Sequence, residues 1–197
     1  MGKQALYTIG LTLLMATLWS SCKDDSQPKP PAVSTKPGLI YLINEGNFQW
    51  GNASLASYDP EKKEFTDKLY ESVNGFPIGD VFQSMVRHNG AFYLVLNNSG
   101  KILQLDTSNL ELKRTFSGFT SPRYMLPLQG DKALVTDLYS KSVSVLDLVS
   151  GSITKTVRID GWTEQILQIE DEIWIGNRGN NKVYLLDANA LTLKDSL

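Results

Sequence analysis

Short runs of alternating apolar and polar residues follow one another from residue 38 to residue 197. Three segments, which begin at Gln83, Arg123 and Glu164, share one order of features: an alternating run, a tight polar turn and a second apolar run. Alternation with a period of two is the pattern of a half-buried β-strand, and a polar turn between two such runs predicts a hairpin. Each segment is therefore predicted to form two antiparallel strands.

A third apolar alternation, ending in an aspartate, follows each predicted hairpin. These aspartates are Asp106, Asp147 and Asp187, and Asp59 ends an earlier copy, which gives successive spacings of 47, 41 and 40 residues. A turn and a fourth alternating strand come next, as at residues 112–116. A four-stranded unit that repeats at about 40 residues is the signature of a β-propeller blade.

The predicted fold is therefore all-β, a β-propeller with about four blades of four antiparallel strands. The blades are placed at residues 38–72, 81–118, 122–160 and 163–197. Only three strands fit the first blade, which lacks its innermost strand. We expect the chain to be a fragment of a larger ring of seven or eight blades, because the first blade lacks its innermost strand and the C-terminal residues offer no strand to replace it; a complete four-bladed ring is the alternative.

The repeated aspartates have two interpretations. An aspartate at the first position of a turn accepts hydrogen bonds from backbone groups two or three residues further on, which predicts a structural role. A ring of carboxylates is the alternative. Trp174 lies in an alternating run and is expected to pack between blades.

The N-terminal segment differs from the rest. An apolar run of about 15 residues follows Lys3 and ends shortly before Cys22, the single cysteine. A membrane-spanning helix needs roughly 20 residues, so residues 1–21 are predicted to be a secretory signal peptide, with a retained membrane anchor as the alternative. The proline-rich residues 22–37 are predicted to be a tether.

Cys22 has the position of the cysteine in the lipobox of bacterial lipoproteins, which this segment resembles. The resemblance implies acylation of Cys22 and a lipid anchor to the membrane. The acidic residues that follow resemble the export signal of surface lipoproteins. We therefore expect a protein on the outer membrane that faces the cell exterior.

The amino-acid composition argues against several classes of function. The net charge is -2, with both signs interspersed, so no nucleic acid is expected as a partner. The single cysteine excludes a disulfide within the chain and a cysteine-based metal cluster. The single histidine, His88, falls in a predicted inner strand beside an Asn-Gly turn, at the end of the blades opposite residues 44–52 and 97–100, so no Ser-His-Asp triad or histidine-rich metal site is expected. We expect no enzyme and no resident cofactor or metal. Glu45 with Asp80 is the carboxylate pair left for glycoside chemistry.

The loops at one end of the predicted blades differ from those at the other. This end collects residues 44–52, 74–80, 97–100, 118–124, 137–140, 161–164 and 177–181. Asn and Gly favour turns in any case, but that does not explain the aromatic residues Phe48, Trp50, Tyr124, Tyr139 and Trp162 there. Amides with aromatic rings suit a large neutral ligand rich in amides or hydroxyls.

Several loop motifs also resemble a known family. Asn-Glu-Gly-Asn-Phe-Gln at 44–49, Gly-Asp-Val-Phe-Gln-Ser-Met-Val at 79–86 and Gly-Phe-Thr-Ser-Pro-Arg-Tyr at 118–124 closely resemble the YncE-like surface propellers, specifically the BtuG-type cobalamin-binding lipoproteins. The resemblance covers residues 38–197. It implies a seven-bladed surface propeller that binds cobalamin or a related corrinoid and hands it to a TonB-dependent outer-membrane transporter.

Ten residues are predicted to contact the ligand or a partner: Asn47, Phe48, Trp50, Asp80, Gln83, Arg123, Tyr124, Trp162, Glu164 and Gln165. For some of them a structural role is the alternative. Asp80 and Arg123 would form an ion pair between blades, and Gln83 and Gln165 would line the central channel. Two other function classes stay open, a protein-interaction or glycan-binding surface propeller and a surface lyase or glycosidase.

Overall fold

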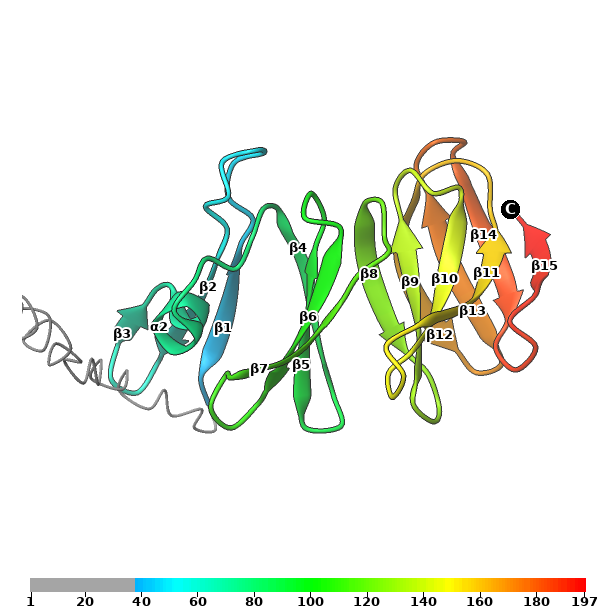
Figure 1. Cartoon of the computed structure of the whole chain (residues 1–197). Coiled ribbons are helices and arrows are strands. Elements are labelled where there is room, and N and C mark those ends of the chain that lie inside the picture. The colour runs from blue at the N-terminus through cyan, green and yellow to red at the C-terminus, as the bar shows by residue number, and fades with distance from the viewer. Residues whose placement is uncertain (1–37) are drawn as a thin grey trace, which may run out of the picture. The chain divides into compact units, whose positions relative to one another are not determined.

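The computed structural model describes residues 38–197, which form 15 strands and one short helix. The strands build four antiparallel sheets that follow one another along the chain (Figure 1). The predicted signal peptide, the tether and Cys22 lie outside the described residues. Within residues 38–197, no helix is both long enough and apolar enough to cross a membrane.

The first two sheets occupy residues 40–116. The first consists of β1 (Ile40–Asn44), β2 (Ser54–Asp59) and β3 (Glu64–Thr66), in that order. The second consists of β4 (Phe82–His88), β5 (Ala91–Leu96), β6 (Lys101–Asp106) and β7 (Leu112–Phe116), again in chain order.

The last two sheets occupy residues 122–196. The third consists of β8 (Pro122–Pro127), β9 (Lys132–Asp137), β10 (Ser142–Asp147) and β11 (Ile153–Arg158). The fourth consists of β12 (Thr163–Ile169), β13 (Glu172–Asn177), β14 (Lys182–Asp187) and β15 (Leu193–Ser196). Each strand pairs with its neighbour in the chain, so the predicted fold of propeller blades, with a first blade of three strands, is confirmed.

Apolar cores fill the spaces between consecutive sheets. All six residues of β5 are buried, because Phe92, Leu94 and Leu96 pack toward the first sheet while Tyr93 and Val95 pack toward the third. Side chains alternate between the two faces of a strand, so one strand contributes to two cores. This double burial stabilises a stack of sheets, since each blade is covered by its neighbours.

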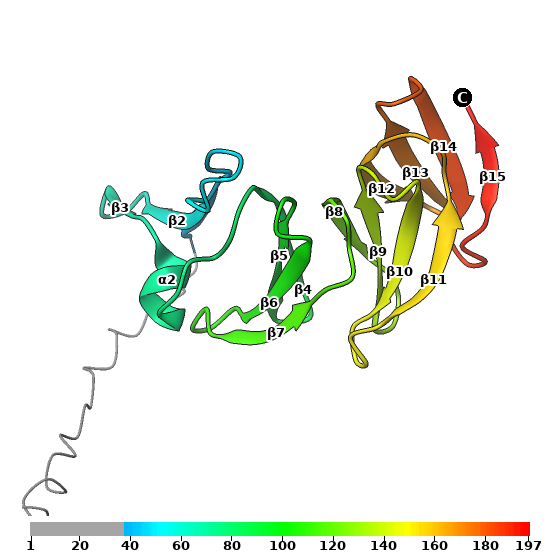
Figure 2. The ribbon, with the colours of Figure 1, turned by 45° about the horizontal axis from the view of Figure 1, so that its top comes forward.

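Helix α2 (Leu69–Asn74) was not predicted. It follows β3, and Figures 1 and 2 show it beside β2. Its Leu69 and Tyr70 are buried in the core between the first two sheets, and Gly75 ends the helix with a φ of 79°. Six residues are too few for a 3.6-residue period to show in the sequence.

The repeated aspartates cap turns, as predicted. Asp147 Oδ1 accepts hydrogen bonds from the N–H groups of Val149 (3.1 Å) and Ser150 (2.6 Å). Asp59 and Asp187 make equivalent pairs of bonds, and Asp106 accepts from Ser108. These bonds lower the pKa of Asp147, chiefly through Ser150, because they favour the ionised carboxylate. The carboxylates thus belong to the turns and form no ring.

The position of Trp174 differs from the prediction. In β13, Ile173 and Ile175 enter the core shared with the third sheet, so Trp174 faces the other way. It is half-buried and opposes Leu167 and Leu185 across the ladder. The alternating pattern predicted the strand correctly, but a period of two does not show which of the strand's two faces a neighbouring sheet covers.

Candidate functional site

Hydrogen bonds tie together the loops at the end of the sheets that was predicted to bind. The backbone N–H of Gln49 donates to Asp80 Oδ2 at 2.8 Å, and that of Trp162 donates to Asn177 Oδ1 at 3.0 Å. The N–H of Thr120 donates to the side chain of Asp137 in the same manner, at 2.8 Å. Each bond joins a loop to the connection between two blades, so this end is a set of mutually supported loops.

A β-bulge at the start of each inner strand positions the predicted polar residues. The register shifts between Phe82 and Ser84 in β4, with equivalent shifts in β8 and β12. Five predicted site residues lie within these three bulges: Gln83, Arg123, Tyr124, Glu164 and Gln165. A bulge leaves residues out of the ladder and redirects their side chains. This local irregularity is what turns the polar side chains away from the sheet.

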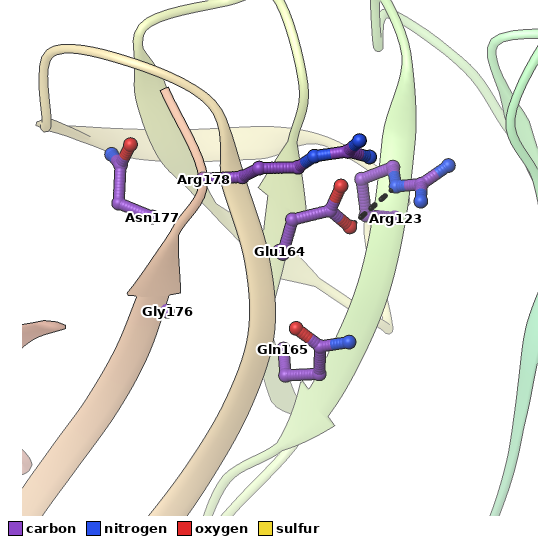
Figure 3. Close-up of a pocket in the computed structure, with 6 residues that line it drawn as sticks. All are labelled: Arg123, Glu164, Gln165, Gly176, Asn177 and Arg178. Carbon is purple, nitrogen blue, oxygen red and sulfur yellow. Dashed lines mark hydrogen bonds and ion pairs between the residues drawn. The ribbon is translucent and has the colours of Figure 1, made fainter. Parts of the chain in front are cut away.

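A pocket of about 390 Å³ opens between the third and fourth sheets (Figure 3). It is lined by Arg123, Glu164, Gln165, Gly176, Asn177 and Arg178. Three of these were predicted, and they come from β8 and the start of β12. The other three come from the end of β13 and the loop after it. The pocket therefore depends on two neighbouring blades.

An ion pair crosses the pocket from one blade to the next. Arg123 Nε donates to Glu164 Oε2 at 2.7 Å, with side chains that are 18% and 9% exposed. The alternative pair of Arg123 with Asp80 is wrong. The two bulges place Arg123 and Glu164 at equivalent positions of adjacent blades, whereas Asp80 precedes β4 and is used by another loop.

The Asn177 side chain serves the architecture of the pocket. Its Oδ1 accepts from the N–H groups of Trp162 and Gly179, both at 3.0 Å, and its Nδ2 donates to the Asp160 carbonyl at 2.9 Å. Gly161, with a φ of 100°, leaves the space for it, since a Cβ there would lie 2.4 Å from Asn177 Oδ1. Asn177 therefore fixes the connection between the third and fourth blades.

Two exposed aromatic residues lie in loops that adjoin the elements lining this pocket. Tyr139 and Trp162 meet edge to face, with ring centroids 6.2 Å apart, and are 59% and 46% exposed. The N–H of Arg178, a lining residue, donates to the Trp162 carbonyl at 2.9 Å, so the backbone at Trp162 adjoins the pocket lining. Tyr124 is also near, because Gln165 Nε2 lies 3.4 Å from its hydroxyl. The site thus combines charge, amides and exposed aromatic surface.

Asp80 holds loops of the first two blades together. In addition to Gln49, the side-chain amide of Asn98 donates to its Oδ2, and its own N–H donates to Ser99 Oγ at 2.9 Å. Burial of the carboxyl acts to raise its pKa, but hydrogen bonds from Asn98 and from backbone N–H groups outweigh it and lower the pKa. The geometry supports the structural interpretation of Asp80.

The other predicted residues lie apart from this pocket lining. Asn47 belongs to the long loop after β1, where its carbonyl accepts from the Trp50 N–H at 3.0 Å. Phe48 and Trp50 in that loop are 63% and 75% exposed. Gln83 lies in its bulge with Oε1 buried and without a hydrogen-bond partner. These residues form a second region on the first two blades.

Gly176, Asn177 and Arg178 were not among the ten predicted contact residues, although residues 177–181 were placed at the predicted binding end. Arg178 is the one charged residue among residues 177–181, and that was the available signal. Gly176 gave no such signal in the sequence, because it contributes to the pocket only by having no side chain to fill it. No group of three or more His, Cys, Asp or Glu side chains within residues 38–197 is placed to hold a metal ion.

Comparison with solved structures supports the fold alone. The Neurospora crassa Pan2 WD40 domain superposes with a TM-score of 0.62 at 13% identity, over 90% of this chain and 52% of that one. The computationally designed Ika8 protein gives 0.58 at 10% identity, over 82% and 46%. Kuenenia stuttgartiensis hydrazine synthase gives 0.51 at 15% identity, over 54% and 32%. The chain thus spans between a third and about half of the length of these structures.

At the level of sequence, no curated protein matches the chain. A family model described as a domain of unknown function, DUF5074, matches residues 38–197, the same residues that form the four sheets. By this match over most of its length, the chain belongs to the DUF5074 family.

Proposed function

We propose that the chain is a surface lipoprotein that captures a ligand by binding and release, without chemical conversion. One observation carries the proposal: the pocket between the third and fourth blades, with an exposed aromatic pair in the adjoining loops. A volume of about 390 Å³ lies in the range of small-molecule sites. Rings that are half exposed without a ligand are available to bury apolar parts of one.

The ligand proposed is cobalamin or a related corrinoid. Such a molecule is larger than the pocket, so the pocket receives one polar arm while Tyr139 and Trp162 cover part of the remainder. Gln165 supplies both a donor and an acceptor for amide arms. Support comes from this geometry together with the loop motifs at 44–49 and 118–124.

The proposed setting is the outer surface of the outer membrane, with Cys22 acylated. The partner proposed to receive the ligand is a TonB-dependent transporter. Phe48 and Trp50 lie outside the pocket lining and are strongly exposed, so they favour a second candidate function, contact with a partner protein or a glycan.

Calorimetric titration of cyanocobalamin into the purified full chain tests the proposal. We expect saturable binding that Trp162→Ala weakens by roughly tenfold, because truncating an aromatic anchor removes more than about 1 kcal/mol of binding energy. Phe65→Ala is the matched control, since Phe65 is 60% exposed on β3, outside the loops. Absence of binding by the unmodified chain would overturn corrinoid capture. Equal weakening by both variants would show that the pocket between the third and fourth blades is not the corrinoid site.

A further inference from the structure

The pocket between the third and fourth blades carries an excess of positive charge. Its lining contains two arginines, Arg123 and Arg178, and one carboxylate, Glu164. At neutral pH these three side chains leave one positive charge. In Figure 3 the Arg178 side chain runs past Glu164 toward Arg123, so both guanidinium groups lie at the same pocket.

Most of the donors on these arginines are unused by the described part of the chain. Arg123 donates to Glu164 through Nε, and its two terminal NH₂ groups make no hydrogen bond with residues 38–197. The Arg178 side chain forms no ion pair or hydrogen bond with them either; only its backbone N–H is engaged, with the Trp162 carbonyl. A guanidinium has five N–H donors in a planar fork, so several remain for a ligand.

The surrounding contacts hold these donors in place. Glu164 is only 9% exposed and binds Arg123 through Nε, which fixes the plane of that guanidinium. The backbone N–H of Arg178 donates to the Trp162 carbonyl, and the Trp162 N–H donates to Asn177 Oδ1, so the chain at residues 177–178 is tied to Trp162. Glu164 is thus a positioning residue that neutralises one of the two charges. A site with one charge left over matches a ligand group that carries one negative charge.

We propose that this pocket binds a single oxyanion group of the ligand, a phosphodiester or a carboxylate, between Arg123 and Arg178. Both groups present two oxygens in the geometry that a guanidinium binds through two parallel hydrogen bonds. The inference rests on the proposed function and adds the chemical class of the arm that enters the pocket.

Gly176 keeps the pocket open. Its φ is not in the left-handed region, and a Cβ there would make ordinary contacts with Gln165 at 3.7 and 3.8 Å. The backbone therefore tolerates a side chain in this strand. Gly176→Val fills part of the pocket while leaving both arginines and Glu164 in place. This variant therefore tests the contribution of the cavity separately from the contribution of the charge.

The first test uses small anions with the full chain. Dimethyl phosphate, acetate and uncharged trimethyl phosphate are titrated while the backbone amide resonances are followed by NMR. We expect saturable shifts for residues 176–178 with at least one of the two anions and none with trimethyl phosphate. Dimethyl phosphate as the tighter ligand identifies a phosphodiester, and acetate as the tighter ligand identifies a carboxylate.

Arg178→Ala is expected to weaken anion binding by roughly tenfold or more, since it removes charge-assisted hydrogen bonds to the oxyanion. Gly176→Val is expected to abolish it. Arg87→Ala is the matched control, because Arg87 is an exposed arginine near the C-terminal end of β4, at the opposite end of the sheets. Absence of saturable shifts, binding of trimethyl phosphate with equal strength, or equal effects of the two arginine variants would overturn the proposal.

Cyanocobalamin and dicyanocobinamide separate this proposal from corrinoid capture, because only the first contains a phosphodiester. If the arm is a phosphodiester, Arg178→Ala weakens binding of cyanocobalamin and leaves dicyanocobinamide unchanged. Anion binding without corrinoid binding would refute corrinoid capture and leave the oxyanion pocket standing. Cyanocobalamin binding that is insensitive to Arg178→Ala, with no binding of the small anions, would refute the pocket and leave capture standing.

Discussion

The junction between the third and fourth blades and the junction between the first and second blades are built from similar apolar cores but differ in their polar groups. Where the third and fourth meet, Arg123 pairs with Glu164, and Asn177 uses both its oxygen and its nitrogen. Where the first and second meet, Asn74 and Asp80 are hydrogen-bonded, but several other buried polar atoms have no partner. The hydroxyl of Tyr70 is one, and burial raises the pKa of this residue to about 12.

The buried polar atoms without a hydrogen-bond partner are concentrated in one part of the chain. Within residues 38–197, six of the seven buried side-chain atoms that lack a hydrogen-bond partner belong to residues 41–88: Tyr41 Oη, Tyr70 Oη, Glu71 Oε2, Asp80 Oδ1, Gln83 Oε1 and His88 Nε2. Within the described residues the first sheet has three strands, and helix α2 adds Leu69 and Tyr70 to the core that this sheet shares with the second. Apolar burial tolerates such irregular packing, whereas a polar atom requires a partner at a defined distance and angle.

The largest expected effect comes from the cores of the two junctions. Leu134 and Leu55 are both fully buried, in the core between the last two blades and in the core between the first two. Leu134→Ala is expected to lower the free energy of unfolding by about 3–4 kcal/mol, and Leu55→Ala by about 2, because a three-stranded sheet with an open edge relaxes more readily around a cavity. Chemical denaturation measures both. Equal losses would show that the first junction is as rigid as the last.

The second effect is that of the ion pair. Glu164→Gln is expected to cost roughly 2 kcal/mol of unfolding free energy, since it leaves Arg123 largely out of water without a counter-charge. Asp160→Asn breaks the Arg158–Asp160 pair, whose side chains are 82% and 64% exposed, and is expected to cost about 0.5 kcal/mol or less. Thermal or chemical unfolding of both variants measures the two losses of unfolding free energy. Similar losses would contradict the importance of burial for the Arg123–Glu164 pair.

A smaller effect is expected at Asp80. Asp80→Asn is expected to cost about 1 kcal/mol at pH 7, because the amide replaces acceptor capacity that Gln49 and Asn98 use. The pKa of Asp80 is lowered in the folded chain, so its stabilisation is complete above the usual value of 3.8 and is lost as the pH falls through the lowered one. Unfolding free energies of both proteins should therefore converge in acid, and a difference that grows in acid would contradict this assignment.

The smallest effect is expected where a polar atom has no partner to lose. Gln83→Leu is expected to change the unfolding free energy by less than about 0.5 kcal/mol, or to increase it, since a buried, unpaired acceptor is removed. Asn97→Leu at the next junction is expected to cost about 1–2 kcal/mol, because Asn97 Nδ2 donates to Ser121 Oγ and to the Pro122 carbonyl. Equal costs would show that Gln83 is paired in solution.

Sequence reasoning reached the blade pattern and part of the site. Arg123, Glu164 and Gln165 were predicted because they begin repeated strands, and they line one pocket. Arg178 and Gly176 were missed, since they belong to the end of a different strand and the loop after it. The pair of Arg123 with Asp80 was wrong because sequence position does not show which of two neighbouring blades a bulged residue faces.

The sequence by itself determined the number and order of strands, the aspartate-capped turns and the end of the sheets at which the polar and aromatic loops gather. These features depend on local periodicity and on turns of a few residues, which a single chain displays directly. Only the tertiary structure decided the partner of Arg123, the outward face of Trp174 and the assembly of the pocket from β8, β12 and β13. Those features depend on bulges and on the contact of one sheet with the next, and both arise from three-dimensional packing rather than from the order of residues.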